Sequence, residues 1–114
     1  MLSQVIINAL PCLPQQKGDW SVYLLLCKNE AFYCGISNRV KIRWQAHLAG
    51  KGARYTRMHP PKQMRLVCQN LSKTVAARCE YQLKQLNAAE KANLWALLDD
   101  FKPDQVIDSQ SLLA

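Results

Sequence analysis

The stretch from Trp20 to Cys27, WSVYLLLC, is the feature that most constrains how this chain can fold. Its residues carry no charge and include the apolar, aromatic and β-branched types that strands favour, so the run is typical of a buried β-strand. The next three residues, KNE, make a short turn, and a second strand-like run follows from Ala31 to Ile36. The two runs are most simply paired as an antiparallel hairpin.

A helix is predicted after the hairpin, over about residues 39–49. Ser37 or Asn38 can cap its start, and Gly50 is placed to end it. Two rows of residues spaced by four run along this helix. The row that we expect to dock on the sheet is apolar and consists of Val40, Trp44 and Leu48. The second row lies about 100° around the helix, at the rim of the helix–sheet contact, and consists of Arg39, Arg43 and His47.

The remainder of the chain predicts one more strand and two more helices. Residues 50–63 contain two glycines and two prolines without an apolar period, so we expect an ordered basic loop at best. Residues 63–69 alternate like a strand, with one face formed by Met64, Leu66 and Cys68. Ser72 is placed to cap the second helix, and Asn87-Ala88-Ala89-Glu90 resembles a capping box that opens the third. The buried positions expected on these two helices are Val75, Cys79, Leu83, Leu86, Leu94, Trp95, Leu97 and Leu98.

The order β-β-α-β-α-α predicts an α/β (α+β) fold, a three-stranded antiparallel sheet flanked by helices. A chain of 114 residues is long enough for one hydrophobic core and too short for two. We place the domain at residues 20–98, between an N-terminal extension at 1–19 and an acidic C-terminal tail at 99–114.

The distribution of charge indicates a nucleic-acid partner. The chain has 15 Lys and Arg against 8 Asp and Glu, a net charge of +7. No acidic residue occurs from Ala31 to Cys79, a segment that contains ten basic ones. Since a solvated face usually mixes both signs, a surface with one sign favours the phosphate backbone of nucleic acid as partner. A generic solvated face is the alternative.

The cysteines and the N-terminal segment bear on location. Five cysteines, with no Cys-x-x-Cys pair and only two histidines, give no zinc-ligand spacing. We expect reduced, mostly buried thiols in a cytoplasmic protein. The first twenty residues lack a basic start and a long apolar core, so we expect neither a signal peptide nor a membrane span.

The predicted elements and several of their residues together resemble the GIY-YIG nuclease family. The first motif stands here as Val22-Tyr23-Leu24 and the second as Tyr33-Cys34-Gly35. Arg43 comes ten residues after Tyr33, His47 four residues later, and Glu80 falls on the second predicted helix. The loop GKGARYTR at 50–57 looks most like that of the small stand-alone UPF0213 (YhbQ-like) group. The resemblance runs from about Trp20 to Leu98.

The resemblance implies metal-dependent cleavage of phosphodiester bonds. Tyr33 is then the candidate to take a proton from the attacking water, and Tyr23 to orient that water or share the task. Arg43 is implied as the clamp on the phosphate, through its planar fork. His47 is implied either to shuttle a proton or to hydrogen-bond the phosphate.

Glu80 is implied as the metal ligand, with Mg²⁺ or Mn²⁺ as cofactor. Mg²⁺ often uses one or two carboxylates and keeps several waters, so one glutamate can suffice and a one-metal mechanism is expected. The residues expected to contact nucleic acid without catalysing are Arg39, Lys51, Arg54, Tyr55 and Arg57. The expected function is a DNA endonuclease selective for structure or ends rather than for a long sequence. Ile36 stands where several family nucleases carry a lysine, which leaves the rate of catalysis open.

Each assignment has a structural alternative. Tyr23 and Tyr33 are also consistent with cross-strand packing, and Arg43 and His47 with the surface of an amphipathic helix. Glu80 and Lys84 have the spacing of a surface ion pair. At the level of function, the alternatives are a nucleic-acid-binding module that keeps the GIY-YIG fold without catalysis, and an adaptor that binds an acidic protein.

Overall fold

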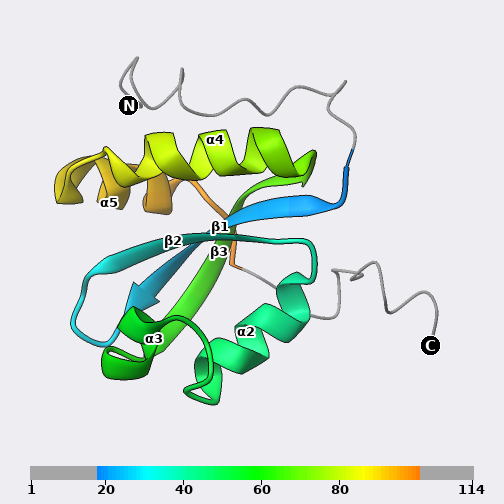
Figure 1. Cartoon of the computed structure of the whole chain (residues 1–114). Helices are drawn as coiled ribbons and strands as arrows, with labels where there is room; N and C mark the ends of the chain where they lie inside the picture. Colours follow the sequence, from blue (N-terminus) through cyan, green and yellow to red (C-terminus); the bar gives the residue numbers. More distant parts are fainter. Residues whose placement is uncertain (1–17, 101–114) are drawn as a thin grey trace.

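A three-stranded antiparallel sheet forms the centre of the structure, a computed structural model that describes residues 18–100 (Figure 1). Its strands are β1 (Trp20–Cys27), β2 (Phe32–Ser37) and β3 (Pro61–Leu71). The order in the sheet is β2-β1-β3, so β1 is the middle strand and both neighbours run antiparallel to it. The predicted hairpin and the predicted third strand are confirmed.

The helices lie in two pairs on opposite sides of this sheet (Figure 1). α2 (Val40–Leu48) and α3 (Arg54–Met58) cover one side. α4 (Lys73–Lys84) and α5 (Ala88–Ala96) cover the other. The α/β (α+β) class and the β-β-α-β-α-α order are confirmed. The expected loop at 50–63 is wrong over residues 54–58, where α3 forms, and at Pro61 and Lys62, where β3 has already begun.

Strand β1 supplies side chains to two separate cores because successive residues of a strand point to opposite faces. The α4 core includes Val22, Leu24, Cys34, Ala76, Cys79, Leu83 and Leu94. The α2 core includes Tyr23, Leu25, Cys27, Val40 and Met64. A strand covered on both faces reads as a continuous apolar run, which explains the uninterrupted pattern of β1.

Strand β3 carries irregularities that the alternation of its sequence did not predict. Its 11 residues face the 8 of β1, and the register shifts at three places along the pair. At one of them Tyr23 pairs with Leu66 while Val22 pairs with Cys68, so Val67 is an extra residue. Each extra residue resets the alternation. Cys68 therefore lies in the α4 core, and its expected place on one face with Met64 and Leu66 is wrong.

Helix α2 is rotated relative to the predicted docking. Val40 is buried and Trp44 packs against the α2 core, but Leu48 is 55% exposed and His47 is 1% exposed. The expectation that Leu48 docks and His47 lies at the rim is wrong. The reason is that His47 finds hydrogen-bond partners for both ring nitrogens inside the fold, so its burial carries no unpaired polar atom.

The ends of α2 agree with prediction at one end only. Arg39 is the N-cap residue and no side chain caps the helix; Ser37 Oγ instead accepts from the Arg39 backbone N–H at 2.9 Å. At the other end Gly50 has a φ of 73°, and the Gly50 and Lys51 amides donate to the carbonyls of His47 and Ala46. This pair of bonds is a Schellman motif, which requires the left-handed conformation that glycine adopts readily.

The two helices of the α4 core begin as predicted. Ser72 caps α4 by accepting from the Val75 amide, and Asn87 with Glu90 forms a complete capping box at α5. Leu94 and Trp95 are buried, whereas Leu97 is 59% exposed, so its expected inward position is wrong. Leu97 is the C-cap of α5, where the helical spacing on which the prediction rests ends.

The chain outside residues 18–100 is not described, and the proposed domain limits therefore stay predictions. Within that range Asp100 still contacts the sheet, because its carboxylate accepts from Arg65 Nε at 2.8 Å. Cys27, Cys34 and Cys79 are buried free thiols as expected, whereas Cys68 is disulfide-bonded, against expectation. Among the helices of the described range, none has the length and apolar character needed to cross a membrane.

Candidate active site

The pleat of the hairpin places the key residues of the two tyrosine motifs on one face of the sheet. Tyr23 lies opposite Gly35, and Leu25 lies opposite Tyr33. Paired residues of neighbouring strands share a face. Tyr23, Gly35 and Tyr33 therefore all point to the side covered by α2 and α3.

Gly35 is required by the close approach of Tyr23. A Cβ atom added at Gly35 would lie 2.4 Å from the Tyr23 hydroxyl oxygen and 2.5 Å from the ring carbon that bears it. No real Cβ contact is that short, and Tyr23 is 1% exposed with little room to move. The glycine of the second motif thus makes space for the tyrosine of the first.

A buried hydrogen-bond chain links Tyr23 to α2 and α3. The Tyr23 hydroxyl lies 2.9 Å from His47 Nε2, and His47 Nδ1 lies 2.7 Å from Thr56 Oγ1. The Thr56 hydroxyl in turn donates to the carbonyl oxygen of Ala53 at 3.0 Å. His47 and Thr56 are each 1% exposed. The chain therefore runs through the protein interior, from the middle strand to the first turn of α3.

Burial keeps both ends of the Tyr23–His47 pair neutral. Desolvation is the main cause that raises the pKa of Tyr23 to about 12, opposed by a hydrogen bond from Arg43 and its charge. Desolvation, followed by the positive charge of Arg43, lowers the pKa of His47 to about 4. At neutral pH the pair rests as phenol and neutral imidazole.

Arg43 and Tyr33 complete this group of side chains. Arg43, on α2, lies beside Tyr23, where its hydrogen bonding and charge act to lower the Tyr23 pKa, and it is partly exposed. The Tyr33 ring meets His47 edge-on, with centroids 5.9 Å apart, and stacks on Tyr55 at 5.9 Å with 12° between the planes. Tyr55 is also held by the β1–β2 turn, because its hydroxyl accepts from Asn29 Nδ2 at 3.0 Å. Four of the five predicted catalytic residues, Tyr23, Tyr33, Arg43 and His47, thus lie together.

Glu80 is the fifth, and it lies on α4 against the opposite face of the sheet. Its side chain is 24% exposed, with one carboxylate oxygen 3.6 Å from Lys84 Nζ. It also lies near β2: burial first, and then the Glu80 charge, raise the pKa of Cys34 to about 12. Cys34 is the chain neighbour of Tyr33, and β2 is an edge strand. No contact joins Glu80 to the four grouped residues within the described range, so the convergence of Tyr33, Arg43 and Glu80 stays a prediction.

The basic residues predicted to contact nucleic acid surround the α2–α3 side. Lys51, Arg54 and Arg57 are exposed, and Tyr55 and Arg39 are partly buried. Arg39 Nε is the one buried side-chain nitrogen or oxygen in the described range without a hydrogen-bond partner. No acidic residue lies in the first turn of α2 or α3. Within the described range, Arg39, Lys51, Arg54 and Arg57 take part in none of the salt bridges, so their charges on this side are not paired with a carboxylate.

Thr56 and Gly52 belong to the site and were not predicted. A Cβ added at Gly52 would lie 2.3 Å from His47 Nδ1, so this glycine permits the loop to pass against the imidazole. The sequence offered no periodic signal for either residue, because both occur in a segment rich in glycine and basic residues. They could have been predicted only if His47 had already been known to be buried on α2 against that loop.

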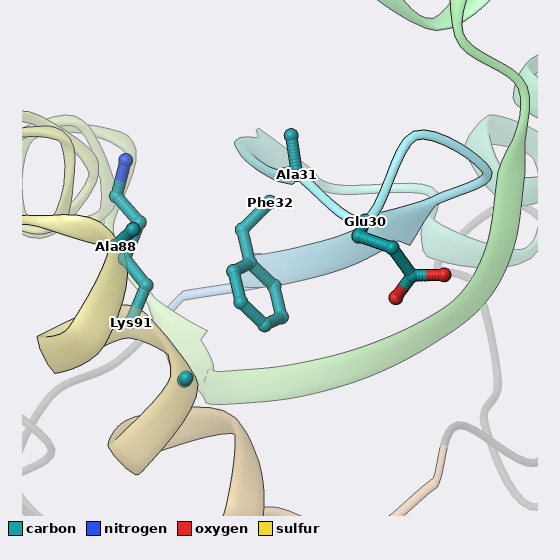
Figure 2. A pocket seen from close by; sticks show the side chains of 6 residues that line it. Glu30, Ala31, Phe32, Ala88 and Lys91 are labelled. Atoms are coloured by element: carbon teal, nitrogen blue, oxygen red, sulfur yellow. The ribbon is translucent and has the colours of Figure 1, made fainter.

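A cavity of about 340 Å³ lies apart from these residues (Figure 2). It is formed between the β1–β2 turn and the start of α5, and is lined by Glu30, Ala31, Phe32, Ala88, Lys91 and Ala92. Phe32 packs against the α4 core, so the cavity opens on the face of the sheet opposite Tyr23 and His47. None of its lining residues is a predicted site residue.

Comparison with known proteins points to one family. A family model described as the GIY-YIG catalytic domain matches residues 19–93. A UPF0213 protein of Neisseria meningitidis serogroup A is 52% identical over 78 residues, covering 68% of this chain and 86% of the relative. A UPF0213 protein of Xanthomonas axonopodis pv. citri is 49% identical over 72 residues, covering 63% and 71%. No solved structure matches the chain significantly. The chain belongs to the GIY-YIG family, within its UPF0213 group.

Proposed function

We propose that this protein is a metal-dependent endonuclease that hydrolyses phosphodiester bonds in DNA. GIY-YIG domains form a nuclease superfamily, which implies a nucleic-acid substrate. The observation that most supports the proposal is the grouping of Tyr23, Tyr33, Arg43 and His47 on one face of the sheet. Hydrolysis of a phosphodiester requires proton transfer from water and a clamp for developing negative charge, and these side chains offer both.

Burial separates the roles of the two tyrosines. A general base must reach the water proton directly or through one bridging water. Tyr33 is partly exposed and suits that position, whereas Tyr23 is 1% exposed and is engaged by His47. Tyr33, once its own phenolic proton has been lost to solvent, therefore takes the proton of the attacking water. Tyr23 stays behind it and shares the task through its hydrogen bond to His47.

Arg43 and His47 have separate roles, in binding the phosphate and in transferring a proton. The planar fork of Arg43 pairs with two phosphate oxygens while hydrogen-bonding Tyr23. Both ring nitrogens of His47 are already engaged inside the protein, which favours the proton shuttle over direct binding of the phosphate. A phosphate bound at Arg43 offsets the guanidinium charge, the second cause of the low pKa of His47, and so makes the imidazole a better proton acceptor.

Glu80 is the candidate ligand for Mg²⁺ or Mn²⁺. Its partly exposed carboxylate keeps acceptor capacity beside a long 3.6 Å contact to Lys84. Residues 18–100 contain no cluster of three or more His, Cys, Asp or Glu side chains placed to hold a metal. This donor set fits one hard cation that retains waters and binds substrate phosphate, rather than a two-metal centre. When bound, the cation supplies positive charge that stabilises the phosphorane-like transition state.

The basic surface supports selectivity for structure or ends of DNA. Lys51, Arg54 and Arg57 are exposed on and before α3, beside the partly buried Arg39. Contacts from such side chains to phosphates fix the position of a nucleic acid without reading its sequence.

The test compares Glu80→Gln with Lys84→Ala. Labelled single-stranded, duplex and branched DNA and matched RNA are incubated with each protein in Mg²⁺, Mn²⁺ or EDTA. Wild type is expected to give metal-dependent products, Glu80→Gln to lose them at least about 100-fold, and Lys84→Ala to keep them. If the ion pair alone mattered, both variants would behave alike, since each removes the pair.

Two results would contradict the proposal. Binding without products in every wild-type reaction would favour the non-catalytic module, for which the Glu80–Lys84 pair is simply a surface ion pair. Products that persist in EDTA or in Glu80→Gln would remove the metal from the mechanism. Larger product yields from RNA would change the substrate class and leave the reaction intact.

A further inference from the structure

Thr56 lies at the inner end of the hydrogen-bond chain, and its hydroxyl has a single proton. That proton is given to the carbonyl oxygen of Ala53, which only accepts, at 3.0 Å. The 2.7 Å contact with His47 must then be formed by Nδ1–H donating to Thr56 Oγ1. The backbone of α3 thus determines which ring nitrogen of His47 carries the proton.

The remaining hydrogen bonds of this chain of side chains then have only one possible direction. With Nδ1 protonated, Nε2 of a neutral imidazole is an acceptor, so the Tyr23 hydroxyl donates to it at 2.9 Å. The Tyr23 oxygen then keeps its acceptor capacity toward the neighbouring Arg43 guanidinium, which only donates and which acts to lower the Tyr23 pKa. The reverse order would leave the Tyr23 proton facing a cation and the Ala53 carbonyl with the Arg57 amide, at 3.1 Å, as its remaining donor. The order from Tyr23 to Ala53 is the one in which each proton of the three side chains has an acceptor.

We propose that Thr56 is a positioning residue that sets the direction of hydrogen-bond donation, the proton order, from Arg43 through Tyr23 and His47 to Ala53. It thereby fixes the orientation of the Arg43 guanidinium. The consequence for Arg43 rests on the proposed nuclease function, whereas the proton order does not. Geometry supports the assignment at two positions, Thr56 in α3 and Gly52 in the loop before it. Thr56 and His47 are each 1% exposed, and Gly52 passes so close that a Cβ there would lie 2.3 Å from Nδ1.

The groups that surround His47 are consistent with a neutral ring of fixed tautomer. Tyr23 from β1 and Thr56 from α3 bond its nitrogens, and the Tyr33 ring from β2 meets it edge-on. Arg43 on its own helix is the charged neighbour, and its sign disfavours a second proton on the imidazole.

The first measurement is the tautomer of His47 by long-range ¹H–¹⁵N correlation NMR at neutral pH. The expected result in the wild type is a protonated Nδ1 and a bare Nε2. Thr56→Val, which keeps the shape and removes the hydroxyl, is expected to lose this preference. Thr56→Ser, which keeps the hydroxyl, is expected to retain it. A protonated Nε2 in the wild type, or an unchanged tautomer in Thr56→Val, would overturn the proposal.

The second measurement is cleavage and DNA binding of the same three proteins. Misplacing Arg43 is expected to lower kcat in Thr56→Val by about 10- to 100-fold. Thr56→Ser is expected to stay within about threefold of wild type, because it keeps the donor and loses only the methyl that stiffens the side chain. Full kcat in a Thr56→Val protein that has lost the tautomer would remove the link to Arg43.

Failure of the nuclease proposal gives a different pattern. If the wild type cleaves nothing, the tautomer measurement still decides the proton order. The affinity of Thr56→Val for DNA, compared with that of wild type, then decides whether the orientation of Arg43 has changed. If Thr56→Val does not fold, the tautomers of the wild type and of Thr56→Ser decide the proton order. A Thr56→Ser protein that keeps the tautomer but loses kcat would then overturn the link to Arg43.

Discussion

Gly35 and Gly50 are both glycines near the candidate site, and they are needed for different reasons. Gly35→Ala places a Cβ 2.4 Å from the Tyr23 hydroxyl. We expect this overpacking to cost about 1–3 kcal/mol and the displaced Tyr23 to lower cleavage by about 100-fold. Urea denaturation and cleavage rates measure the two effects.

Gly50→Ala is the matched control, because an added Cβ there meets no atom within 4 Å and only the φ of 73° opposes it. We expect a loss of about 1 kcal/mol in stability and near-normal cleavage. Equal activity of the two variants would mean that the Tyr23–Gly35 contact has no bearing on the reaction.

His47 is expected to make the stability of the fold depend on pH. Its pKa is about 4 in the folded protein, against 6.5 when unperturbed, so the unfolded chain binds more protons between these values. The stabilisation is fully present above about pH 6.5 and is lost as pH falls towards 4, by roughly 2–3 kcal/mol. Urea titrations from pH 7.5 to 4 should show this decrease in wild type and in His59→Gln, and a smaller decrease in His47→Gln.

The elements show how far the sequence alone could predict this fold. The hairpin, the Gly50 end of α2 and the caps at Ser72 and Asn87 follow from local patterns, because each depends on residues close in the chain. The predicted buried and exposed positions of Leu48 and His47 were interchanged. The periodicity of a helix does not indicate which of two adjacent rows finds hydrogen-bond partners inside the fold. His47 is buried by contacts with residues 24 positions before it and 9 after it.

Helix α3 and the face of Cys68 were missed for the same reason. The first turn of α3 depends on the Thr56 hydroxyl and on packing against His47, and the register of β3 depends on its partner β1. Of the site, the residues that resemble family motifs were found, and Thr56 and Gly52 were not. Those two act through a contact made only when α2 and the loop have folded together.

At the scale of the whole molecule, the sheet separates the larger apolar core from the face on which Tyr23, Tyr33, Arg43 and His47 are grouped. The α4 core holds most of the buried apolar residues, whereas the α2 core contains Tyr23 and packs against Tyr33 and Tyr55. The buried and hydrogen-bonded His47 and Thr56 lie on the face covered by α2 and α3, with exposed basic side chains beside them.

The distribution of charge gives a salt-dependent prediction. Changing Lys51, Arg54 and Arg57 together to Gln should weaken nucleic-acid binding and reduce the slope of log K against log salt by about 2–3, because each phosphate contact contributes roughly 0.7–0.9. The control changes Lys73, Arg78 and Lys84 to Gln, which removes equal charge from α4. Fluorescence anisotropy across a salt series measures both, and equal loss in the control would show that net charge alone drives binding.

The irregular pairing of β3 bears on how the length of this protein can vary during evolution. Deleting an ordinary residue of a strand moves every residue beyond it to the opposite face. Deleting Val67 instead brings Leu66 and Cys68 next to each other, still opposite Tyr23 and Val22, with each in the core it already occupies. The other two register shifts offer the same freedom. Natural one-residue gaps in this strand are therefore expected to gather at these three places.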